Sequence, residues 1–74
     1  MQNVNVNKLK GKIVECGLSI SDLADMIGIN KSTLYRKLDT NGESLLVSEA
    51  NAIVKALHLT SAEAMAIFFS QLVA

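Results

Sequence analysis

Gly28 divides residues 18–38 into two short helical patterns, and this arrangement constrains the fold more than any other feature of the sequence. Apolar residues spaced four apart mark one face of each pattern: Leu23 and Ile27 before the glycine, Leu34 and Leu38 after it. Glycine tolerates the positive φ of a sharp turn, and the small Ala24 lets two helices cross closely. The segment is therefore predicted to form two helices joined by a tight turn, a helix-turn-helix.

Capping residues predict where each helix of this pair begins. Ser19 precedes Asp22 by three residues, so its hydroxyl can cap the amides of a helix while the carboxylate favours the positive helix end. Asn30 is a good cap for a second helix that begins at Lys31. We therefore expect the two helices at about residues 20–27 and 31–38.

The rest of the chain contains three further helical patterns, and no proline interrupts them. They lie at about residues 8–16, 48–57 and 61–73, the last opened by Thr60 and Glu63 at capping-box spacing. A chain of 74 residues holds one small core and no second domain. We predict an all-α, five-helix domain over residues 8–74. A flexible leader is expected over residues 1–7, where alternating Asn and Val leave a short strand as the alternative.

The formal net charge of zero argues against nucleic-acid binding, but the charge is unevenly distributed. Residues 1–38 carry six basic and three acidic side chains, whereas residues 39–74 carry one basic and four acidic ones. The first half, which contains the predicted helix pair, therefore has a balance of +3. This asymmetry is a hint of contact with an anionic partner.

Helical geometry assigns a DNA-reading face to the second helix of the pair. At about 100° per residue, Ser32 and Arg36 point away from the apolar side, where they would face base edges in a major groove. Arg36 suits bidentate contact with guanine, and the flanking lysines suit contact with phosphate. A solvated polar face in an ordinary helical hairpin is the alternative. The predicted DNA-binding residues are Ser19, Ser21, Asn30, Lys31, Ser32, Thr33, Tyr35, Arg36 and Lys37.

The segment LSISDLADMIGINKSTLYRKL, residues 18–38, resembles the helix-turn-helix of the lambda-repressor-like, Cro-type (XRE) DNA-binding family. The likeness covers about residues 8–74 and includes the stretches at 9–19, 48–50, 59–63 and 67–69. It implies a phage or prophage regulator that binds a double-stranded operator as a dimer and controls transcription. Three positions depart from the family pattern: Ile20 stands where glutamine is common, and Lys37 and Lys12 each stand where an apolar residue is common.

The last helical pattern is apolar over a wide arc, which is unusual for a helix buried on one side only. Exposed apolar patches of this kind usually mark an interface. We therefore predict a homodimer through residues 61–73, with contacts from Met65, Phe68, Phe69 and Leu72. The alternatives are that the core absorbs this surface, or that the helix binds a different regulator and the protein is an interaction module.

Residue patterns typical of enzymes, metal sites and membrane proteins are missing from the sequence. There is no nucleophile beside a base, no phosphate-binding glycine loop and no carboxylate pair, so we expect no enzymatic activity, cofactor or small-molecule substrate. Single His58 and Cys16 residues give no zinc spacing. The longest apolar run, residues 64–69, is shorter than the roughly 18 residues of a membrane span, and nothing resembles a secretory leader, so we expect a cytoplasmic protein.

Overall fold

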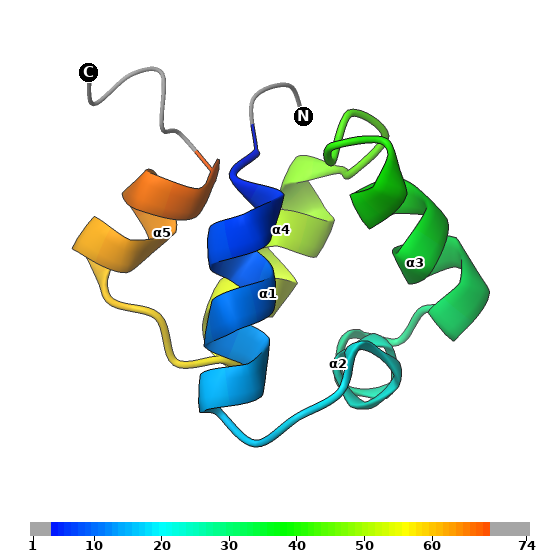
Figure 1. Ribbon diagram of the computed structural model, residues 1–74, viewed down its shortest axis with the longest axis horizontal. Helices are drawn as coiled ribbons and strands as arrows, with labels where there is room; N and C mark the ends of the chain where they lie inside the picture. The colour runs from blue at the N-terminus through cyan, green and yellow to red at the C-terminus, as the bar shows by residue number, and fades with distance from the viewer. Residues whose placement is uncertain (1–3, 69–74) are drawn as a thin grey trace.

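Five α-helices and no strand make up residues 4–68, the part of the chain that this computed structural model describes. In chain order they are α1 (Val6–Glu15), α2 (Ile20–Ile27), α3 (Lys31–Asp39), α4 (Val47–Ala56) and α5 (Ser61–Phe68). In Figure 1, α5 lies on one side of α1, and α2 and α3 lie on the other. The predicted all-α class with five helices is confirmed.

Local capping contacts explain why α2 begins and ends where it does. The Ser19 hydroxyl accepts a hydrogen bond from the Asp22 N–H at 3.0 Å, and the Asp22 carboxylate accepts one from the Ser19 N–H at 2.9 Å. At the other end Gly28 adopts a φ of +79°, which lets the Ile29 N–H donate back to the Ala24 carbonyl. Both ends lie where the sequence predicted them.

A single apolar core joins the five helices. Within residues 4–68 no polar or charged residue is buried. The core consists of Val4, Leu9, Ile13, Leu23, Ala24, Leu34, Leu38, Leu45, Ala50, Ile53, Leu57, Ile67 and Phe68. The apolar faces predicted for α2 and α3 therefore point inward, and the surface left to solvent on α3 is polar.

The start of the fold differs from the leader predicted over residues 1–7. Val4 is buried, and a Cβ placed on Gly42 would lie only 2.7 Å from the Val4 Cβ. Asn5 caps α1 by accepting from the Lys8 N–H at 3.1 Å, and its own N–H donates to the Ile67 carbonyl at 2.7 Å. Residues 4–7 thus belong to the domain, because tertiary contacts hold them.

The last described helix also corrects a prediction. Phe68 and Ile67 are buried in the core, so the core absorbs part of the wide apolar arc and Phe68 is not available for the predicted dimer interface. Met65 is 46% exposed. Phe69 and Leu72 lie outside the described residues, and the homodimer stays a prediction.

Candidate nucleic-acid interface

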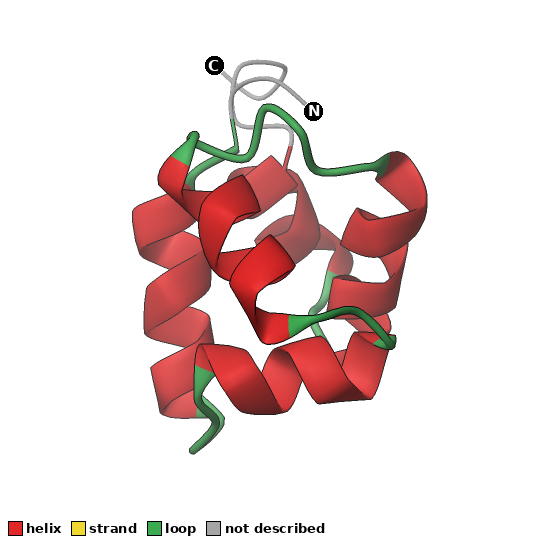
Figure 2. Ribbon diagram, turned by 90° about the vertical axis from the view of Figure 1, so that its right-hand side faces the viewer, coloured by secondary structure: helices red, strands yellow, loops and turns green. Residues whose placement is uncertain are grey.

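The α3 helix lies at the edge of the molecule opposite α5, with α1 between them (Figure 1). Viewed from that side, α3 stands in front of the other helices (Figure 2). It packs against α2, which in turn packs against α4. Its first turn is capped by Asn30, whose side-chain oxygen accepts from the Ser32 N–H at 2.8 Å. Asn30, predicted to contact DNA, is therefore already used as a helix cap.

One face of α3 is polar and exposed. Leu34 and Leu38 are buried, whereas Ser32 and Arg36 are exposed, as the helical geometry predicts. Lys31 is also exposed, and the side chain of Tyr35, one turn later, is 45% exposed. Four polar side chains on this face have no hydrogen-bond or ion-pair partner within residues 4–68. They are those of Lys31, Ser32, Tyr35 and Arg36. We refer to these four residues as the α3 face.

Two other residues predicted on α3 lie at the margin of this surface. Thr33 is half-buried. The Lys37 side chain is only 15% exposed, and its ammonium donates to both carboxylate oxygens of Glu49 on α4, at 2.6 and 2.8 Å. Lys37 follows Leu34 by one turn, so it faces α4 rather than solvent. The expectation that Lys37 is free on the DNA-facing surface is corrected, because its ammonium is paired with Glu49.

Glu49 is held in its charged form by that pairing. Partial burial disfavours the carboxylate, but hydrogen bonds from Lys37 and from the Leu46 N–H outweigh it and lower the pKa of Glu49 below its ordinary value. Sequence reasoning missed this contact. The two residues are twelve positions apart across a turn, and no local spacing rule connects them.

The start of α2 is less suited to phosphate than the sequence suggested. The Ser19 N–H already donates to Asp22, and its hydroxyl already accepts from the Asp22 N–H. The hydrogen bond from the Ser19 N–H, with a smaller contribution from the Ser19 side chain, lowers the pKa of the Asp22 carboxyl and keeps it charged. Ser21 is half-buried, and Asp25 adds a second exposed carboxylate on α2. Negative charge on α2 therefore leaves α3 as the cationic part of the pair.

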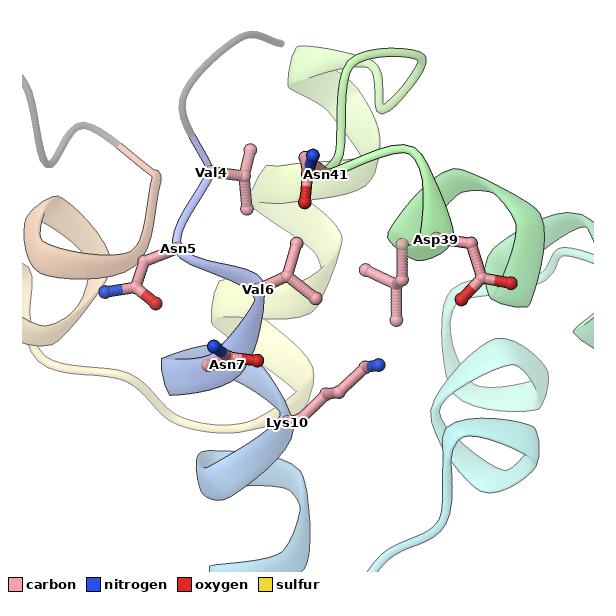
Figure 3. A pocket seen from close by; sticks show the side chains of 8 residues that line it. Val4, Asn5, Val6, Asn7, Lys10, Asp39 and Asn41 are labelled. Carbon is pink, nitrogen blue, oxygen red and sulfur yellow. The ribbon is translucent and has the colours of Figure 1, made fainter.

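A groove of about 320 Å³ lies beside α3, between the beginning of α1 and the end of α3. Figure 3 shows Lys10 and Asp39 on opposite sides of it. Its lining residues are Val4, Asn5, Val6, Asn7, Lys10, Leu38, Asp39 and Asn41. Since side chains of both charges and several amides face it, the groove has no preference for an anion. No local pattern in the sequence predicts this groove, because it forms between segments about thirty residues apart.

Lys12 on α1 is also paired inside the protein. Its ammonium forms ion pairs with Glu63 on α5 and, at 3.3 Å, with Glu15. Of the six basic residues before residue 39, two are therefore neutralised by neighbours. The exposed ones are Lys8, Lys10, Lys31 and Arg36, of which the last two lie on the α3 face.

Comparisons of the chain with protein-family models, with curated proteins and with solved structures found no significant match. None of the helices in residues 4–68 is long and apolar enough to cross a membrane. Across the same residues, no three His, Cys, Asp or Glu side chains gather as a metal site.

Proposed function

We propose that this protein binds double-stranded DNA in a sequence-specific manner and regulates transcription, with α3 in the major groove. The observation that carries the proposal is the α3 face: four exposed polar side chains without partners in the described structure, on a helix whose opposite side is buried. A major groove about 12 Å wide admits one α-helix. The likeness of residues 18–38 to lambda-repressor-like proteins supports the same function.

Each residue of the α3 face has a role in this proposal. The Arg36 guanidinium donates two parallel hydrogen bonds to guanine O6 and N7, the commonest specific contact in the major groove. Ser32, one turn earlier, contacts the neighbouring base edge, and Tyr35 flanks both. Lys31 contacts a phosphate from the first turn of the helix. Leu34 and Leu38 hold the helix against the core, so that these side chains meet the DNA in a fixed orientation.

We further propose that two copies bind a two-fold operator, because one short helix contacts only a few base pairs. Two recognition helices reach successive major grooves when they lie about 34 Å apart, one turn of DNA. Exposed Met65 on α5 is the described residue that supports a contact between copies.

Selection of bound fragments from random DNA at physiological salt tests the proposal. Enrichment of one motif with two-fold symmetry is expected, with half-sites spaced by about 10 base pairs. Affinity for the selected duplex is then measured as a function of salt. It should fall steeply, because each phosphate contact contributes about 0.9 to the slope of log affinity against log salt. If the selection enriches no motif, the proposed function is wrong.

A second candidate function is a protein-interaction module. Leu46 and Val47, adjacent at the start of α4, are 57% and 61% exposed, and a partner could cover them. The salt experiment separates the two functions, because binding through an apolar surface responds little to salt. A variant with Leu46→Ser and Val47→Ser should keep DNA affinity if the first proposal is right, and should lose partner binding under the second.

A further inference from the structure

We propose that Lys37 and Glu49 are positioning residues, whose ion pair ties α3 to α4, fixes the rotation of α3 about its own axis and so aims the α3 face at the DNA. Lys37 itself makes no phosphate contact. The inference rests on the proposed function for its DNA consequence, while the positioning of α3 can be measured without DNA.

The Glu49 carboxylate connects two helices. Glu49 Oε1 accepts from the Lys37 ammonium at 2.6 Å and from the Leu46 N–H at 2.8 Å, and Oε2 accepts from the same ammonium at 2.8 Å. Leu46 is the residue that precedes the first turn of α4. The carboxylate therefore binds the backbone at the start of α4 and a side chain of α3 at once, across the turn at residues 40–45.

The apolar contacts of α3 do not by themselves fix its rotation. Leu34 and Leu38 are its buried residues, and apolar burial has little preference for direction. The Lys37 ammonium lies within hydrogen-bond distance of both Glu49 oxygens, and it keeps these contacts only while this side of α3 faces α4. Because Arg36 precedes Lys37 by one residue, the two side chains are about 100° apart on the helix. Any rotation that Lys37 fixes is therefore the rotation of Arg36 as well.

The charge of Lys37 stays paired with Glu49. The Lys37 and Glu49 side chains are 15% and 13% exposed, so both charges are largely removed from water. If Lys37 left to bind a phosphate, the Glu49 carboxylate would stay partly buried without its cation, which is unfavourable. The phosphates of nearby DNA would destabilise an unpaired Glu49 carboxylate further, because they repel its negative charge. Lys37 therefore stays with Glu49 when DNA binds.

The DNA-free test is a double-mutant cycle with Lys37→Met, Glu49→Gln and the double variant. We expect the double variant to shift the urea midpoint no further than the larger of the single shifts, since either change breaks the same contact. Amide resonances of α3 should move in the same direction in all three variants. Additive midpoint shifts, or unchanged α3 resonances, would overturn the positioning role.

The DNA test compares Lys37→Met with Lys31→Met on the duplex selected by the wild type and on a mixed-sequence duplex. Lys31→Met should reduce the salt slope by about 0.9, and Lys37→Met should leave it unchanged. Lys37→Met should instead lower affinity for the selected duplex about tenfold relative to the mixed one, comparable to losing one base contact. Lys37→Arg, which keeps a cation beside Glu49, should restore it.

A reduced salt slope in Lys37→Met would show that Lys37 contacts phosphate, and the inference would be wrong. If the wild type binds neither duplex, the proposed function fails. The double-mutant cycle then still decides whether Lys37 and Glu49 orient α3.

Discussion

Lys12 on α1 and Glu63 on α5 form an ion pair, so one salt bridge joins the first helix of the chain to the last helix that the structure describes. Glu63 also accepts from the Thr60 N–H at 2.9 Å, as part of the cap of α5. Its carboxylate therefore contributes both to a helix cap and to the packing of two helices.

This ion pair predicts a pH dependence of stability. The hydrogen bonds from Lys12 and from the Thr60 N–H lower the pKa of Glu63 from 4.5 to about 2. A carboxyl whose pKa is lowered by folding stabilises the protein fully at any pH above the pKa that it has in the unfolded state. For Glu63 this contribution is lost as the pH falls from 4.5 towards 2. Urea midpoints measured from pH 6 to pH 2 should therefore fall less steeply for Glu63→Gln than for the wild type.

The matched control for that experiment is Asp25→Asn, which removes an exposed carboxylate on α2 that has no ion pair within residues 4–68. Its urea midpoint should follow the wild-type dependence on pH. Parallel curves for Glu63→Gln and the wild type would show that the ion pair contributes nothing to stability.

Arg36→Ala should weaken DNA binding without affecting the fold. Losing one bidentate base contact costs about 1–3 kcal/mol, roughly 5- to 150-fold in affinity for the selected duplex. Because the side chain is exposed, the unfolding free energy should change by less than about 0.5 kcal/mol. Fluorescence anisotropy and urea unfolding measure the two effects. Lys55→Ala, an exposed cation on α4, is the control; equal losses in both variants would contradict a reading role for Arg36.

Leu34→Ala should unfold much of the protein. The side chain has no exposed surface, and truncating a buried leucine costs about 2–5 kcal/mol, much of the stability of so small a domain. Far-ultraviolet circular dichroism at 25 °C should show a loss of helix. Val14→Ala provides the comparison, since Val14 is 74% exposed and its truncation should leave the spectrum unchanged. A fully helical Leu34→Ala would place the core elsewhere.

Two glycine substitutions should have opposite effects. Gly42 has a φ of +76°, and a Cβ there would lie 2.7 Å from the Val4 Cβ, so Gly42→Ala should destabilise by more than about 1 kcal/mol. Gly11 lies inside α1 with nothing within 4 Å of an added Cβ, so Gly11→Ala should stabilise by about 0.5–1 kcal/mol. Thermal unfolding compares the two. If the order is reversed, the contact between residue 42 and Val4 is not as described.

The helix pair could be predicted from the sequence because its signals are local. A cap at Ser19, a left-handed glycine at position 28 and a cap at Asn30 each act within four residues, and the structure places all three as predicted. The buried stripe of α3 followed from periodicity alone, and with it the exposure of Ser32 and Arg36.

Predictions failed where a residue's environment depends on distant parts of the chain. Val4 and Asn5 looked like a leader because their contacts, Gly42 and Ile67, are far away in sequence. Phe68 looked like surface because helical periodicity does not show how much apolar area the rest of the core can cover. Lys37 looked like a free cation because its partner Glu49 on α4 comes close only when the turn between the helices is folded.

The contacts of Val4 and Asn5 have a practical consequence for anyone trimming this protein. Deleting residues 1–5 would remove Asn5, which caps α1 and donates a backbone hydrogen bond to Ile67. It would also remove the Val4 side chain that packs against Gly42. An affinity tag joined directly to Val6 in place of residues 1–5 would remove the same contacts. Val4 and Asn5 therefore tie the beginning of the described fold to its middle and to its end, and both residues should be kept.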